Sequence, residues 1–250
     1  MITTTRNDDI AILTLAHGKA NLFDIEFSDA LAAALDACAA SAAKAAVVTA
    51  SGGIFSGGVD LRRLLAGGRG YAEVFLPALG RAFDVAFAFP KPLVAAVNGH
   101  AIAGGCILAC AADRRLMARG SGRIGVPELL VGVPFPTVAL EIMRQAVPAP
   151  QLRTLVFTGE TVDADRAASL GLVDAAVDAD RLFDEAVGAA KALAALPPAA
   201  FAITKQQLRA PALARIREGN ASVDPAIHEY WAAPGTLDTI RAYVARTLKK

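Results

Sequence analysis

Short apolar runs alternate with longer helical patterns along most of the chain. Residues 9–16, 45–50 and 93–97 are rich in alanine, valine, leucine and isoleucine, and each run has the length of a buried strand. Residues 113–118 predict a further short strand. The alternation of such strands with helices predicts an α/β fold built on a parallel arrangement of strands.

Apolar positions at helical spacing predict the elements between these strands. An alanine-rich helix follows the turn at residues 18–24, with Asp24 or Ser28 as its N-cap. Further helices are predicted from about residue 61, over 71–88, from about 104, and over 137–147, 150–157 and 180–195. Residues 158–177 predict a helix followed by a strand, and residues 122–136 predict a loop that carries one carboxylate, Glu128.

Two consecutive prolines, Pro197 and Pro198, mark the main internal boundary. Residues 1–196 hold all the predicted strands and form the predicted core domain. Residues 197–250 are amphipathic, helical and rich in alanine and leucine, so they predict a docking element.

Composition narrows the possible classes of protein. The chain has 25 basic and 24 acidic residues, a formal net charge of +1, which provides no general attraction for nucleic acid or an anionic membrane. Apolar residues make up 54% of the sequence, but no uninterrupted run reaches the roughly 18 residues of a membrane span. The N-terminus has no secretory signal pattern, so we expect a cytoplasmic protein.

The three cysteines, Cys38, Cys106 and Cys110, lie in apolar surroundings and predict buried free thiols rather than disulfides. Cys106 and Cys110 share a helix face, but no histidine or carboxylate stands at the spacing of further ligands. The sequence therefore predicts no metal site.

Two glycine-rich loops, "FSGGVD" at 55–60 and "AIAGGC" at 101–106, each join a strand to a helix. Backbone N–H groups at such a junction are unpaired, and glycine allows a ligand to approach them closely. Two such loops that converge would form an oxyanion hole. Neither loop matches a Walker A motif or a G-x-G-x-x-G fingerprint, so nucleotide binding of those types is not indicated.

Three blocks, "VVTASGGIFSGGVDLRRL", "KPLVAAVNGHAIAGGCILACAADRRL" and "GRIGVPELLVGVPFP", resemble in order and spacing the signature blocks of the crotonase superfamily, the enoyl-CoA hydratase/isomerase family. The resemblance covers roughly residues 5–195, and the helical tail resembles the family's C-terminal trimerisation region. It implies a spiral of repeated ββα units, a homotrimer or a dimer of trimers, and acyl-CoA thioester substrates of fatty acid metabolism. The tail would also close the acyl-CoA pocket. No separate cofactor is implied, because coenzyme A is part of the substrate.

The same resemblance implies roles for individual residues. Val59 and Gly104 match the positions whose backbone N–H groups bind the thioester oxygen, and Glu128 matches a catalytic acid/base. Residues that match or adjoin the substrate and CoA-binding positions are Lys19, Ala20, Asn21, Gly57, Asp60, Arg62, Gly105 and Ile107.

Ile107 separates the possible activities. Family hydratases have a glutamate at this position in addition to the one that Glu128 matches, and two acid/base groups suit the addition of water. A single glutamate can instead move a proton from C2 to C4 of a 3-enoyl thioester, so the pattern favours Δ3-Δ2 enoyl-CoA isomerisation. Two alternatives stay open: a hydratase that recruits another carboxylate, and a non-catalytic acyl-CoA binding protein. The acidic residues considered for that second acid are Asp24, Glu26, Glu73 and Glu141.

Overall fold

Three consecutive strand-strand-helix units form the centre of the fold. The computed structural model describes residues 1–247 of the chain. The units are β3 (Ala45–Ala50), β4 (Ile54–Ser56) and α2 (Leu61–Ala88), then β5 (Leu93–Val97), β6 (His100–Ile102) and α3 (Gly104–Cys110), then β7 (Arg114–Ala118), β8 (Ile124–Gly125) and α4 (Glu128–Val131). This repetition confirms the expected spiral of ββα units in an α/β fold.

The first strand of each unit lies in one sheet and the second strand in another. The larger sheet has the order β1-β2-β3-β5-β7-β10 and the smaller the order β4-β6-β8-β9. The additional strands are β1 (Ile2–Asn7), β2 (Ile10–Leu15), β9 (Thr161–Val162) and β10 (Ala175–Val177). Strands β2 to β10 of the larger sheet pair in parallel, as expected, whereas β1 pairs antiparallel with β2. The four central residues of β1 are exposed, so this strand lacks the apolar pattern that would identify it in the sequence.

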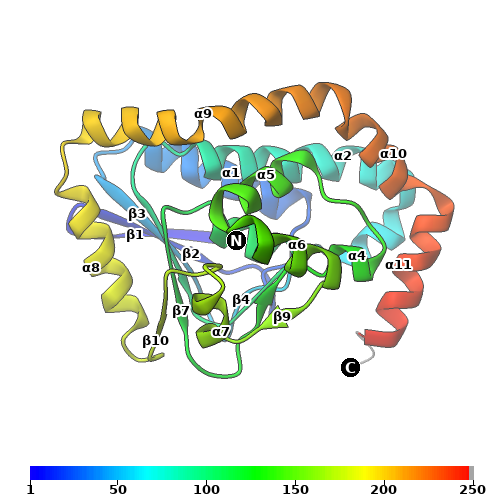
Figure 1. Cartoon of the computed structure of the whole chain (residues 1–250), viewed down its shortest axis with the longest axis horizontal. Coiled ribbons are helices and arrows are strands. Elements are labelled where there is room, and N and C mark those ends of the chain that lie inside the picture. The colour runs from blue at the N-terminus through cyan, green and yellow to red at the C-terminus, as the bar shows by residue number, and fades with distance from the viewer. Residues whose placement is uncertain (248–250) are drawn as a thin grey trace.

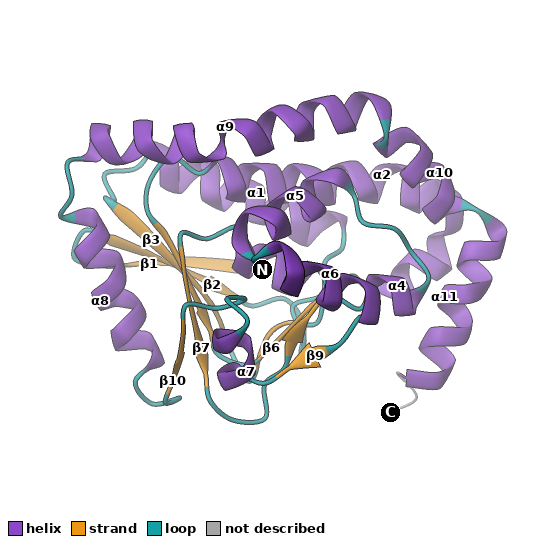
Figure 2. Ribbon diagram, in the orientation of Figure 1, coloured by secondary structure: helices purple, strands orange, loops and turns teal. Residues whose placement is uncertain are grey.

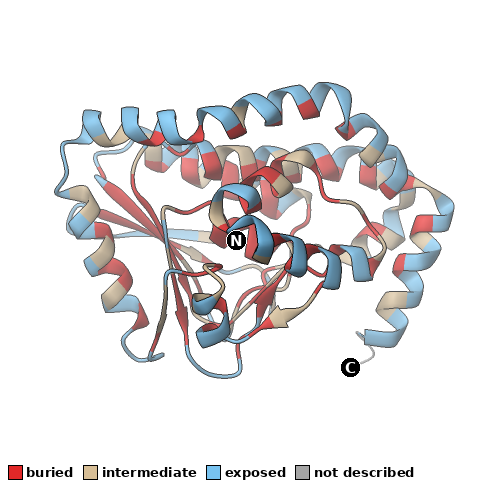
Figure 3. Cartoon of the chain, in the orientation of Figure 1, coloured by how far each residue is buried: buried red, intermediate tan, exposed pale blue. Residues whose placement is uncertain are grey.

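Helices cover both faces of the larger sheet (Figures 1 and 2). α8 (Leu182–Ala194) packs on one face, where Ala186 and Ala190 contact a cluster that includes Ile12 and Val94. α1 (Ile25–Ala40) and α2 lie on the other side within the main core cluster. Figure 3 shows the buried residues on the strands and on the inner sides of these helices, while the outer side of the C-terminal helices is exposed.

Three predicted boundaries need correction or refinement. Asp24, not Ser28, is the N-cap of α1, because its carboxylate accepts a hydrogen bond from the Phe27 backbone N–H at 2.7 Å. The two helices predicted from residue 61 and over 71–88 run on as α2, with a break at Gly68, where φ is +58°. The loop predicted at 122–136 contains the short helix α4, which begins at Glu128.

The chain after α4 is mainly helical, apart from the short strands β9 and β10. The remaining helices are α5 (Thr137–Ala146), α6 (Ala149–Thr158), α7 (Ala164–Ser169), α9 (Pro198–Ser222), α10 (Asp224–Ala232) and α11 (Pro234–Thr247). α9 begins at the predicted proline boundary and runs across α5, and α11 then turns back towards α4 (Figure 1). The last three residues of the predicted final helix lie outside the described residues.

Buried ion pairs hold α9 on the core. Lys205 Nζ lies 2.6 Å from one Asp113 carboxylate oxygen, and an Arg209 nitrogen lies 2.7 Å from the other. Because all three side chains are largely buried, each depends on its partners to offset desolvation. The predicted docking element is therefore attached to the core of its own chain.

The structure also answers two questions raised by composition. Cys38, Cys106 and Cys110 are buried and form no disulfide, as expected. No single helix within residues 1–247 is long and apolar enough to cross a membrane; α8 and α9 pass that test only as a pair, bent by 102°.

Candidate active site

Three neighbouring parallel strands bring the predicted site segments to one edge of the smaller sheet. β4 pairs in parallel with β6, with Ile54 opposite His100, and β6 pairs in parallel with β8, with Ala101 opposite Ile124. The carboxyl ends of parallel strands meet at the same edge. The segments that follow these strands, 57–60, 103–105 and 126–128, therefore emerge side by side.

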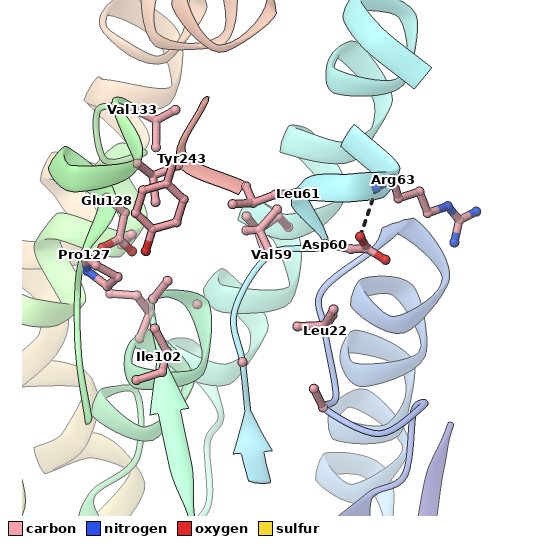
Figure 4. A pocket seen from close by; sticks show the side chains of 18 of the residues that line it. Leu22, Val59, Asp60, Leu61, Arg63, Ile102, Pro127, Glu128, Val133 and Tyr243 are labelled. Carbon is pink, nitrogen blue, oxygen red and sulfur yellow. Dashed lines mark hydrogen bonds between the residues drawn. The ribbon is translucent and has the colours of Figure 1, made fainter. Parts of the chain in front are cut away.

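A cavity of about 720 Å³ opens where these segments meet (Figure 4). Its apolar wall includes Leu79, Phe83, Ile107, Val131, Val133, Pro136, Ala139 and Trp231. The exposed or half-exposed part of its lining is more polar and includes Asp60, Arg62, Arg63 and His100. A long apolar pocket with a polar mouth suits a ligand that has an apolar chain and a charged head.

The two glycine-rich loops touch each other at the cavity. A Cβ atom added to Gly58, whose φ is +88°, would lie 2.8 Å from the Ile102 carbonyl oxygen and 2.9 Å from Ala103 Cβ. Ala103 itself has φ +50°, an unusual value for alanine. Only glycine allows this approach at position 58, so the two glycine-rich loops meet at the cavity.

Backbone N–H groups from both loops are available at this point. The bridge between Phe23 and Val59 uses the Gly58 carbonyl and the Asp60 N–H, so the Val59 N–H points away from Phe23. Within the described chain, neither the Val59 N–H nor the Gly104 N–H has a hydrogen-bond partner, and both residues line the cavity. Two free donors beside a cavity can stabilise a developing oxyanion.

Glu128 is the buried carboxyl group of the cavity. It is 8% exposed, begins α4 and lines the cavity together with Ile107 and Val131. Its Oε2 atom is buried and has no hydrogen-bond partner. Burial raises the pKa of this carboxyl to about 8, and the nearby backbone amide of Glu128 itself offsets only part of that effect. Glu128 can therefore bind and release a proton near neutral pH.

No second carboxylate faces Glu128 among the described residues. Ile107 is buried one turn into α3 and lines the cavity, and the one other acidic side chain in the lining, Asp60, caps α2 by accepting the Arg63 N–H. Figure 4 shows Asp60 across the cavity from Glu128, with its carboxylate turned towards α2. The acidic residues considered as a replacement acid lie outside the lining and in ion pairs: Asp24 and Glu26 with Arg63, Glu73 with Arg69, and Glu141 with Arg144 and Arg215.

The other predicted binding residues divide into two groups. Ala20, Gly57, Asp60 and Arg62 line the cavity, together with Val59, Gly104, Ile107 and Glu128. Lys19, Asn21 and Gly105 do not. Lys19 is exposed, and Gly105 packs so closely that an added Cβ would lie 2.5 Å from the Ser56 carbonyl oxygen.

Asn21 has a structural task in this loop. Its side-chain amide donates hydrogen bonds to the Ile54 and Phe55 carbonyls at 3.0 and 3.2 Å, and its φ is +47°. Asn21 thereby fixes the loop of residues 18–22 against β4 and holds Ala20 at the cavity. Its side chain is already committed to the backbone of its own chain.

The sequence did not identify several residues of the lining, among them one arginine and two aromatic side chains of the tail. Arg63 pairs with Asp24 and Glu26 beside the predicted Arg62, and Trp231 and Tyr243 reach the cavity from α10 and α11. The Trp231 indole N–H donates to the Pro134 carbonyl at 2.9 Å, which fixes the ring in the wall. The family resemblance implied that the tail closes the pocket, but neither it nor the amphipathic pattern of the tail identified these two side chains.

The described residues hold no group of three or more histidine, cysteine, aspartate or glutamate side chains that could bind a metal ion. The arrangement instead offers oxyanion donors, one acid/base and an apolar pocket. This combination can stabilise an enolate and move a proton beside it.

The chain matches one known family over most of its length. The sequence profile of the enoyl-CoA hydratase/isomerase family matches residues 5–233. The chain belongs to this family. It is thus a crotonase-superfamily enzyme, and the family acts on acyl-CoA thioester substrates.

Individual relatives carry both activity names. A probable enoyl-CoA hydratase of Mycobacterium avium is 32% identical over 202 residues, which are 80% of this chain and 78% of the relative. The human mitochondrial Δ3-Δ2-enoyl-CoA isomerase superposes with a TM-score of 0.94 over 99% of this chain and 98% of its own, and its 19% identity supports the fold alone.

One Mycobacterium tuberculosis protein illustrates the ambiguity. Its structure has been described once as an enoyl-CoA isomerase and once as a probable enoyl-CoA hydratase, and both structures are 30% identical to this chain with a TM-score of 0.79. They cover 96% and 99% of this chain, and this chain covers 97% and 98% of theirs. Similarity establishes the family, whereas the reaction must be argued from the site.

Proposed function

We propose that this enzyme converts 3-enoyl-CoA to 2-enoyl-CoA with Glu128 as its single acid/base. The observation that carries the proposal is one buried, unpartnered carboxyl group in a cavity where Ile107 occupies the position of a second acid. Transfer of one proton between two carbons needs one such group, whereas hydration must also activate a water molecule.

The proposed reaction has two proton transfers. The ionised Glu128 takes a proton from C2, and the electron pair left behind delocalises through the thioester carbonyl and the C3–C4 double bond. The same proton then returns to C4, which leaves the double bond between C2 and C3. The atoms balance without an oxidant or a separate cofactor.

The Val59 and Gly104 N–H groups would hold the thioester oxygen while it carries negative charge. Their positions beside the cavity support this role, and removal of one such donor typically costs about 3 to 4 kcal/mol of transition-state stabilisation. The apolar wall formed by Ile107 and Val131 would keep water from the dienolate.

We place the CoA moiety at the polar mouth of the cavity. Ala20, Gly57, Asp60 and Arg62 line that region, and Arg62 is exposed where it could meet a phosphate group. Residues 197–250 would close the pocket, a role supported by Trp231 and Tyr243 in its wall. We retain a trimer or a dimer of trimers as a prediction of the family resemblance.

Replacement of Glu128 by glutamine tests the proposal. Glutamine keeps the volume and cannot exchange the proton, so turnover of 3-enoyl-CoA should fall by roughly a thousandfold. Glu141→Gln is the matched control, because it changes a buried glutamate outside the cavity lining. Equal turnover by wild type and Glu128→Gln would exclude this mechanism, and tight acyl-CoA binding without turnover in both would support a non-catalytic binding protein.

A hydratase is the second candidate, favoured by the names of relatives such as the M. avium protein. The same purified enzyme should be assayed with 3-enoyl-CoA and with 2-enoyl-CoA. We expect isomerisation to exceed hydration in kcat/KM. The reverse order would identify a hydratase that relies on Glu128 with a water molecule held by other groups.

A further inference from the structure

The unpartnered Glu128 carboxyl raises a difficulty for its proposed role. To take a proton from C2 the carboxyl must first be ionised, and ionisation of a buried carboxyl without a hydrogen-bond donor is unfavourable. A donor in the cavity wall would resolve the difficulty. Such a hydrogen-bond donor would have to come from the side chains that line the cavity.

Most polar side chains in the wall already have partners. The Trp231 indole N–H donates to the Pro134 carbonyl, the Thr247 hydroxyl donates to the Tyr243 carbonyl, and His100 Nδ1 accepts the Arg123 N–H. Of the charged residues at the mouth, Asp60 caps α2, and Arg62 and Arg63 belong to the first turn of that helix. Figure 4 shows Asp60 and Arg63 across the cavity from Glu128. Within residues 1–247, the Tyr243 hydroxyl is the wall hydroxyl for which no hydrogen bond is formed.

Tyr243 also has a suitable position. In Figure 4 the Tyr243 ring and Glu128 lie on the same side of the cavity that both residues line, and the tyrosine hydroxyl is turned towards that cavity. The Arg246 guanidinium lies 5.8 Å from the centre of the Tyr243 ring. A guanidinium at this distance from an aromatic ring is attracted to it, which helps to hold the ring in place.

The backbone of α11 is held close to α4. Gly132 ends α4 with φ +96°, and an added Cβ there would lie 2.5 Å from Thr239 Cγ2 of α11. The two helices therefore meet where only glycine fits. Tyr243 follows Thr239 by one helical turn, so this contact fixes the tyrosine relative to Glu128.

We propose that Tyr243 is a positioning residue whose hydroxyl donates a hydrogen bond to the ionised Glu128 carboxylate. This inference rests on the proposed function of Glu128 and adds the C-terminal helix α11 to its machinery. In the structure the hydrogen bond is not formed. It forms, directly or through one water molecule, when Glu128 carries its charge, and it makes that charge less costly in the apolar cavity.

Few other groups compete for this role. On α3 the buried thiol of Cys106 is close enough to Glu128 for the two groups to interact electrostatically, but a thiol is a weak hydrogen-bond donor. α4 has no other titratable side chain besides Glu128 in the sequence ELLV. The neighbouring lining from α5, Ala139, is apolar.

Tyr243→Phe tests the inference, with Tyr230→Phe as the matched control because Tyr230 is exposed on α10 and does not line the cavity. The pKa of Glu128 should be measured without turnover, by infrared spectroscopy of its protonated carboxyl, with the band assigned through Glu128→Gln. We expect Tyr243→Phe to raise this pKa by about one unit and Tyr230→Phe to leave it unchanged. The acid limb of kcat/KM for 3-enoyl-CoA should move by the same amount.

The two proposals can fail separately. An unchanged Glu128 pKa in Tyr243→Phe overturns the role of Tyr243, whatever the turnover. A raised pKa together with full turnover by Glu128→Gln supports the hydrogen bond and overturns the catalytic role of Glu128 instead. A lower kcat in Tyr243→Phe with an unmoved pKa would assign Tyr243 to packing of the pocket and also overturn the inference.

Discussion

Glu128 and Glu141 are both buried glutamates on neighbouring helices, yet their surroundings differ completely. Glu128 is 8% exposed and Glu141 is 3% exposed. Arg215 and Arg144 approach the Glu141 carboxylate at 2.7 and 3.2 Å, whereas one oxygen of Glu128 is buried with no partner. The ion pair of Glu141 with Arg215 joins α5 to α9. Glu128 has no such pair, so its carboxyl group remains available to accept a proton.

The contrast explains why the apolar wall matters as much as the acid. A cation next to Glu128 would lower its pKa and reduce its affinity for a proton, as partners do for carboxylates elsewhere in proteins. Ile107 and Val131 offer no such partner. An unpaired buried acid costs stability when it is ionised, so Glu128 should respond to pH, and the two glutamates should respond in opposite ways to mutation.

The largest expected effect is on catalysis as a function of pH. Because the proposed base must be ionised and burial raises its pKa to about 8, kcat/KM should rise with pH and level off only near or above that value. For a single ionisation near pH 8, the ionised fraction, and with it kcat/KM, falls about fiftyfold between pH 8 and pH 6. Initial rates with 3-enoyl-CoA from pH 5.5 to 9.5 measure it.

Two controls accompany this profile. Glu141→Gln should keep the same profile, since its carboxylate lies outside the cavity lining. An acid limb near the ordinary pKa of a solvated glutamate would mean that Glu128 is solvated in the working enzyme, and the contrast between the two glutamates would then disappear.

A smaller effect is expected on stability. The pKa of Glu128 is higher in the folded protein than in the unfolded chain, so the folded state binds more protons between about pH 4.5 and pH 8. The contribution of Glu128 to stability is full below that window and is lost as pH rises through it. The free energy of unfolding of Glu128→Gln should therefore rise relative to that of wild type between pH 5 and pH 9, by on the order of 2 kcal/mol.

Urea denaturation of both proteins at the two pH values gives this difference. Other titrating groups contribute equally to the stability of wild type and variant. A change with pH in the difference between their free energies of unfolding is therefore due to Glu128. A stability difference between the two proteins that stays constant from pH 5 to pH 9 would show that the Glu128 carboxyl is as easily ionised in the folded protein as in the unfolded chain.

Much of the fold, but not all of it, could be predicted from the sequence. The long apolar runs at 45–50 and 93–97 identified β3 and β5, because a strand buried on both faces needs only apolar residues. β4, β6 and β8 have two or three residues each, too few for a pattern, and they were missed although they align the site. Strands this short are defined by pairing with their neighbours.

The site was likewise predicted only in part. Motif positions identified Val59, Gly104, Ile107 and Glu128, and the structure places all four around one cavity. Tyr243 and Trp231 were not identified, because they reach the cavity through the path of the tail across α5 and back to α4. The isolation of Glu128 from arginine also depends on which charged side chains fold towards it, and the sequence does not specify that locally.

The smallest effect is expected for Glu141→Gln. Glutamine keeps the volume and can still accept a hydrogen bond from Arg215, while Arg144 and Arg215 are about half exposed and regain water when the pair is weakened. We therefore expect a loss of about 1 kcal/mol in the free energy of unfolding and unchanged turnover of 3-enoyl-CoA. A large loss of turnover with normal folding would show that Glu141 communicates with the cavity through α5, whose Ala139 lines the cavity wall one turn or less from it. If stability and turnover follow the expectation, position in the cavity and absence of a partner, rather than burial itself, distinguish the acid that carries the chemistry from the acid that holds two helices together.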